Sequence, residues 1–141
     1  MAADLDVAFT TIDTRNSERF QSLRRELGVS SFGMNVITLA PRQRGRIHAH
    51  ERQEEVFVVL EGELTIAIEG EEHAVAKHGA VRVAPSVRRQ LVNRGSSTLI
   101  LLALGAEGDH VGRDGRAWEA WDEDGEGRAP QEVPLPSDLP V

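Results

Sequence analysis

The chain has 141 residues, no cysteine and a net charge of −7, which predicts one domain with a buried core and excludes disulfides and zinc–thiolate sites. Its first residues are polar and acidic, and no apolar run approaches the ~20 residues of a membrane span, so we expect a cytoplasmic protein without signal peptide or membrane segment. No basic stripe carries interleaved aromatic residues, which argues against nucleic-acid binding.

Residues 1–31 are expected to form a lead-in that contains one short helix. Ser17 is a suitable N-cap and Gly28 a suitable C-cap. Three apolar side chains between them fall on one helical face: Phe20, Leu23 and Leu27. The pattern therefore predicts an amphipathic helix in this segment.

Residues 32–105 change to short runs of apolar and β-branched residues, most of them bounded by glycine, proline, asparagine or charged clusters. Glu61-Gly62 and Glu69-Gly70 stand where tight hairpin turns are needed. No long helical pattern separates the runs, so we predict an antiparallel all-β barrel or sandwich. The eight predicted strands lie within residues 32–40, 46–50, 55–60, 63–68, 72–76, 80–84, 89–93 and 98–104.

The C-terminal extension, residues 106–141, is rich in glycine, proline and acidic residues. Residues 122–141 hold six acidic residues and a single arginine, so most of the net charge lies there. Trp118 and Trp121 are three residues apart and could dock on the barrel from one helical face. After about residue 122 we expect a largely flexible tail.

His48 and His50 are the first candidates for a functional site. Alternate residues of a strand face the same side, so the two imidazoles point together. Two histidines and a carboxylate form a set of ligands suited to a divalent transition metal. Glu55 opens the next strand and would face the interior, whereas Glu54 would face the opposite way.

The spacing H-x-H-x4-E-x6-G, formed by His48, His50, Glu55 and Gly62, resembles the first motif of the cupin superfamily. The resemblance covers residues 34–104 and selects Glu55 by its distance from Gly62. It implies a jelly-roll β-barrel in which the two histidines and the glutamate bind a metal and the glycine closes a hairpin. We therefore expect an all-β cupin-type jelly-roll barrel, with a short N-terminal helix, an irregular acidic tail, and bound Fe, Mn, Ni, Co or Zn.

The family's second motif, G-x5-P-x-G-x2-H-x3-N, is only partly present. Gly79, Pro85 and Asn93 match, but the segment is one residue short after the proline and the histidine that would be the fourth ligand is missing. Counting from Pro85 places Gln90 at that position, and counting back from Asn93 places Arg89 there. Glutamine is a weak oxygen ligand, whereas arginine cannot coordinate and would instead bind an anionic substrate.

Two functions stay open. A metal-dependent enzyme would hold the metal with His48, His50 and Glu55, and would act by oxygenation or isomerisation on a small polar or anionic molecule that Arg89 or Gln90 orients. A non-catalytic module with a degenerate site would bind a small anion instead. The incomplete second motif slightly favours the non-catalytic module.

Two further expectations concern the surface. The run of arginines before the histidine strand, Arg42, Arg44 and Arg46, is either a solvated edge or the guard of a pocket mouth for an anionic substrate. An open barrel exposes unpaired sheet edges, and cupins of this kind are commonly dimers, so we expect a homodimer.

Overall fold

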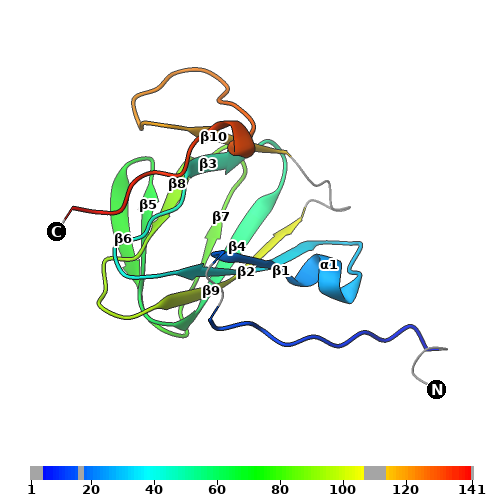
Figure 1. The fold of residues 1–141 in the computed structure, drawn as a ribbon. Coiled ribbons are helices and arrows are strands. Elements are labelled where there is room, and N and C mark those ends of the chain that lie inside the picture. Colours follow the sequence, from blue (N-terminus) through cyan, green and yellow to red (C-terminus); the bar gives the residue numbers. More distant parts are fainter. Residues whose placement is uncertain (1–4, 16–17, 107–113, 141) are drawn as a thin grey trace.

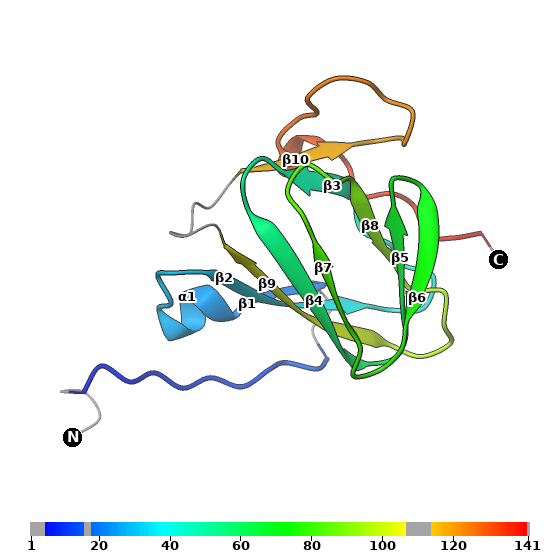
Figure 2. The ribbon, with the colours of Figure 1, turned by 180° about the vertical axis from the view of Figure 1, so that it is seen from behind.

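The computed structural model describes residues 5–15, 18–106 and 114–140, and it shows two five-stranded antiparallel sheets that face each other (Figure 1). The first sheet holds, in spatial order, β1 (Phe20–Ser22), β2 (Gly33–Leu39), β9 (Leu99–Ala106), β4 (Glu54–Glu61) and β7 (Ala80–Val83). The second holds β10 (Gly115–Trp118), β3 (Ile47–His50), β8 (Arg89–Val92), β5 (Leu64–Ile68) and β6 (Glu71–Val75). The sheets do not close into one barrel, and the arrangement is a jelly roll, as predicted (Figure 2).

All eight predicted strands are present, as β2 to β9. The turn after β4 needs its glycine, because Gly62 has a φ of 79° and a Cβ there would lie 2.7 Å from the carbonyl oxygen of Thr98. Asn93 of the second motif is fully buried and donates to the carbonyls of Leu39 and Ser97. These contacts explain why the loops between the strands require Gly62 and Asn93.

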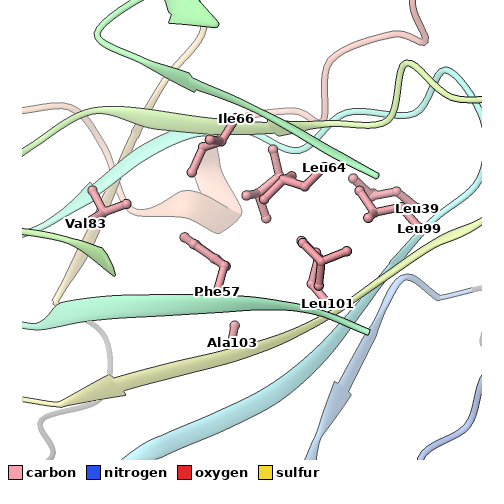
Figure 3. Close-up of a cluster of buried hydrophobic side chains, with 10 residues drawn as sticks. Leu39, Phe57, Leu64, Ile66, Val83, Leu99, Leu101 and Ala103 are labelled. Atoms are coloured by element: carbon pink, nitrogen blue, oxygen red, sulfur yellow. The ribbon is translucent and has the colours of Figure 1, made fainter. Parts of the chain in front are cut away.

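The core lies between the sheets (Figure 3). Phe57 and Val59 on β4 are fully buried, and strand alternation places Glu55 on the same inward face. Burying a side chain of this size stabilises the fold by about 1.5–3 kcal/mol. The buried members of the cluster are Leu39, Phe57, Val59, Leu64, Ile66, Val83, Leu91, Leu99, Leu101 and Ala103.

The N-terminal helix α1 (Leu23–Leu27) is shorter than predicted. Its N-cap is Ser22, whose hydroxyl accepts the backbone N–H of Arg25, and the predicted cap Ser17 lies outside the described residues. Phe20 belongs to β1, where it pairs with Ile37 and is 52% exposed. The hydrogen bonds of this edge strand override the helical pattern. Gly28 ends the helix in the left-handed conformation, as expected.

The C-terminal extension adds a strand that the sequence did not predict. β10 pairs with β3, so that Gly115 lies opposite His50 and Ala117 opposite His48. Trp118 is buried against Ile47, on a strand rather than on the expected helix. The extension therefore covers the edge of the sheet that carries the two histidines.

The last residues run back along the second sheet through the 3-10 turn η2 (Pro130–Glu132). Val133 is 1% exposed, and its carbonyl accepts from Arg46 Nε at 2.6 Å. Arg44 Nε donates to the Ser137 carbonyl, and Leu139 N–H donates to the Arg42 carbonyl. The arginine run thus holds the backbone of the tail, and the expected flexibility stays a prediction. Within the described ranges no helix is long and apolar enough to cross a membrane.

Candidate metal centre

Three side chains from two sheets converge where β3 turns into β4. His48 and His50 lie on one face of β3, and Glu55 faces them from β4. One ligand atom from each residue lies within 4.8 Å of the other two. Glu54 points away and pairs with Arg82 at 2.6 Å, which agrees with the choice of Glu55 over its neighbour.

The second nitrogen of each imidazole fixes the orientation of its ring. His48 Nδ1 lies 3.2 Å from the Arg46 carbonyl oxygen, and His50 Nδ1 lies 2.8 Å from Asp114 Oδ1. A carbonyl and an ionised carboxylate only accept hydrogen bonds, so both Nδ1 atoms carry the proton. In the neutral form of each ring, the Nε2 atom is therefore free to present a lone pair to the site.

These lone pairs point at a carboxylate. His48 Nε2 is 3.4 Å from Glu55 Oε1, and His50 Nε2 is 3.6 Å from Glu55 Oε2. Two donors bound at about 2.1 Å to one ion lie roughly 3.0–3.5 Å apart; the first separation falls in this range and the second lies just above it. Neutral imidazoles facing an anion repel it unless a proton or a cation lies between them. The set of donors therefore fits a divalent transition metal.

The pKa shifts of Glu55 and His50 agree with a site that attracts cations. Burial raises the pKa of Glu55, but hydrogen bonds and charge from His48 and His50 outweigh it, so the pKa lies well below its usual range. Burial lowers the pKa of His50, but Glu55 and Asp114 outweigh it and raise the pKa above 6.5. The carboxylate thus stays ionised, and protonation of His50 competes with metal binding up to a higher pH than for an ordinary histidine.

Asp114 completes the site, and sequence reasoning missed it. Asp114 is 6% exposed, and its carboxylate accepts hydrogen bonds from the backbone N–H groups of Arg52 and Gln53, each at 3.0 Å. Gln53 Nε2 donates to it at 2.6 Å, in addition to His50. These hydrogen bonds lower the pKa of Asp114 despite its burial. No pattern in the irregular extension marks this aspartate, since the contact joins residues 64 positions apart.

Arg89, rather than Gln90, lies on the ligand side of β8. Arg89 is paired with His48 across the sheet, is fully buried, and has Nε 3.9 Å from Glu55 Oε1. Burial lowers its pKa, and the charge of Glu55 opposes this. Gln90 faces the other side and donates to the Gly45 carbonyl at 2.9 Å, so it is not the fourth metal position.

Two cavities meet at the centre. One, of about 470 Å³, has a mixed polar and apolar lining and reaches Arg24 and the C-terminal extension; the other, of about 400 Å³, is mainly apolar and reaches Phe20, Leu39 and Leu91. His50 and Glu55 line both. Arg89 is not among the residues that line either cavity, and its contact with a substrate stays a prediction. Volumes of this size suit small organic ligands.

Comparisons with known proteins agree with the fold. Residues 35–105 match the family described as the cupin domain. A cupin protein from Bacteroides fragilis has a TM-score of 0.63 at 17% identity, covering 84% of this chain and 97% of that one. No curated protein matches the sequence.

Two further structures are similar at 24% identity and a TM-score of 0.58. They are a putative sugar phosphate isomerase from Acidithiobacillus ferrooxidans, with 65% of this chain and 58% of that chain covered, and a sugar phosphate isomerase from Silicibacter pomeroyi, with 72% and 69% covered. The present chain thus spans less than two thirds of the first of them. Identities this low show a shared fold.

Proposed function

The chain belongs to the cupin family, and we propose that it binds one divalent transition metal through His48, His50 and Glu55 and holds a small polar or anionic molecule beside it. The observation that supports this most is the pair of Nε2 atoms, 3.4 and 3.6 Å from one ionised carboxylate, with both rings fixed through Nδ1. Fe, Mn, Ni, Co or Zn would suit this set of donors.

A metal with three protein ligands would keep open positions, where it would polarise an oxygen of the bound molecule. The chain's own residues would do the rest. Asp114 holds the His50 ring, and Arg89 places a positive charge 3.9 Å from Glu55 between the sheets. Apolar side chains of the second cavity, among them Leu39 and Leu91, face one side of the centre. Such a site would serve oxygenation or isomerisation if the protein is an enzyme.

The second candidate is a metal-free binding module. It is favoured by one observation: Arg89 places a permanent cation 3.9 Å from Glu55, at the position where the family has its fourth histidine. In that state Arg89 and a protonated His50 would neutralise the carboxylate between them. A guanidinium at this distance also disfavours a divalent ion.

Titration of Co(II) into chelator-treated protein separates the two candidates. We expect one ion per wild-type chain, with the visible absorption of a nitrogen- and oxygen-ligated ion, and at least a tenfold weaker affinity for His50→Ala. His73→Ala is the matched control, because His73 is an exposed histidine on β6. Equal affinities of His50→Ala and wild type would reject the proposed centre. A metal-loaded sample can then be screened for turnover, with sugar phosphates included because two similar structures carry that name.

We also propose that the chain forms a homodimer. Val7 and Phe9 are 52% and 83% exposed on the N-terminal segment, which runs extended beside the first sheet (Figure 1). Phe32, Val56 and Leu104 line an apolar hollow on the outer face of that sheet. Exchange of the N-terminal segments between two copies would cover such surfaces. A mass near 15.5 kDa at micromolar concentration in light scattering would contradict this assembly.

A further inference from the structure

We propose that Arg24 is the anion-recognition residue of the cavity of about 470 Å³, which takes a small organic molecule through its carboxylate or phosphate group. The molecule's other end would face His50 and Glu55, and this second half rests on the function proposed above. Arg24 lies outside the matched family region and outside the metal-ligand set.

The fold places Arg24 at the cavity wall. Ser22 is the last residue of β1 and pairs with Asn35 of β2, and α1 begins directly after it. The cavity of about 470 Å³ is lined by Arg24 and Asn35 on this side and by His50 and Glu55 on β3 and β4. A single molecule in this space can therefore meet both the arginine and the candidate metal centre.

Arg24 is a cation without a counter-ion in the part of the chain that the structure describes. Its Nε is buried and has no hydrogen-bond partner, and its side chain makes no hydrogen bond or ion pair with the described residues. Arg116 lines the same cavity but is paired with Glu51 at 2.9 Å. Because Arg24 lines the cavity and has no counter-ion among the described residues, its guanidinium can pair with an anion supplied by a ligand.

The carboxylates of the cavity are not available to pair with Arg24. Asp114 already accepts from His50, Gln53 and the backbone of Arg52, and Glu55 faces the two histidines and Arg89. An anion that enters from outside therefore has no protein carboxylate to displace at Arg24.

The residues that line the cavity favour an oxyanion as the ligand. A guanidinium fork binds a carboxylate or a phosphate through two parallel N–H donors. Asn35 adds an amide that makes no hydrogen bond with the described residues and lines both cavities. The volume exceeds that of an inorganic ion, and Ala103 and Pro130 add apolar surface. The occupant that fits is a small organic anion.

The test compares succinate and ribose 5-phosphate with their neutral analogues, 1,4-butanediol and ribose, by calorimetry on the full chain. We expect one of the two anions to bind wild type at least tenfold more tightly than its neutral analogue, in both metal-free and Co(II)-loaded protein. Binding of succinate would identify a carboxylate ligand, and binding of ribose 5-phosphate would identify a phosphate ligand. Arg24→Gln should weaken that binding at least tenfold.

Arg25→Gln is the matched control, because Arg25 is the exposed neighbour on α1 and does not line this cavity. It should leave anion affinity within about twofold, and Arg24→Gln should leave Co(II) affinity within about twofold. Anion binding that depends on Arg24 in protein that takes up no Co(II) would support this inference and reject the metal centre. Failure of both anions to bind wild type at millimolar concentration, or equal binding by Arg24→Gln, would overturn the inference, whatever the result with Co(II).

Discussion

Asp114 Oδ1 accepts a hydrogen bond of 2.8 Å from His50 Nδ1, and it thereby joins the C-terminal extension to a candidate metal ligand on β3. The same carboxylate accepts both backbone N–H groups of the turn that leads into β4. One buried side chain thus fixes the ring of His50 and the path of the chain toward Glu55.

Replacing Asp114 should therefore weaken metal binding although it is not a ligand. Loss of a hydrogen bond that orients a metal-binding histidine typically lowers affinity by about 10- to 100-fold. We expect a loss of this size for Asp114→Ala and a smaller one for Asp114→Asn, measured by Co(II) titration. Glu51→Ala is the control, because Glu51 is an exposed neighbour paired with Arg116. Wild-type affinity in Asp114→Ala would contradict the role of Asp114.

Arg89→His should raise metal affinity. Arg89 lies on the ligand side of β8 and brings a positive charge within 3.9 Å of Glu55. Histidine would replace this charge with a neutral imidazole and restore the fourth ligand of the family motif. Titration of Mn(II) into metal-free protein should show tighter binding than wild type, whereas Gln90→Ala, on the opposite face, should show no change. Equal affinities for wild type and Arg89→His would show that Arg89 does not oppose the metal.

Metal affinity should rise with pH around neutrality. The pKa of His50 is raised above 6.5, so below that raised value the metal-free protein carries a proton on the imidazole. Metal binding needs the unprotonated ring and must release this proton. Affinity should increase as pH rises through the raised pKa and level off above it. Calorimetry in two buffers with different ionisation enthalpies measures the proton release, and its absence at pH 6 would contradict this account.

The raised pKa of His50 also affects the stability of the metal-free protein, which should fall as the pH rises. A histidine with a raised pKa in the folded state stabilises the fold fully below its ordinary pKa of about 6.5, and this contribution is lost as pH rises through the folded pKa. Metal-free protein should lose part of its unfolding free energy over that range, and His50→Gln should not.

Removing the tail should cost more than its composition suggests. Truncation after Arg128 deletes the buried Val133 and the acceptors of Arg44 and Arg46, while it keeps the pairing between Ala117 and Arg128. Burial of one valine and two or three hydrogen bonds stabilise by a few kcal/mol before the entropy of ordering, so we expect the melting temperature to fall by roughly 5–10 °C. A fall of no more than about 2 °C would support the flexible tail that the sequence predicts.

The strands could be predicted because their signals are local. Strand alternation places His48 with His50, and the spacing to Gly62 selects Glu55. The choice between Arg89 and Gln90 could not be made, because a shift of one residue turns a side chain to the other face. The pairing of His48 with Arg89 resolves it.

The remaining parts of the site depend on contacts between distant segments. Asp114 reaches His50 through the pairing of β10 with β3, and Arg24 reaches the cavity because β1 pairs with β2. Residues 20–22 look helical in isolation and become a strand through these same hydrogen bonds. Neither edge strand exceeds four residues, which is too short for a periodic signal.

The central claim is that His48, His50 and Glu55 hold a metal, and elemental analysis of protein purified without chelator tests it most directly. We expect close to one equivalent of Fe, Mn, Ni, Co or Zn per chain in wild type, and less than about a tenth of that in the His48→Ala, His50→Ala double variant. A double variant that keeps a full equivalent, or a wild-type protein that neither carries nor takes up metal, would contradict the account.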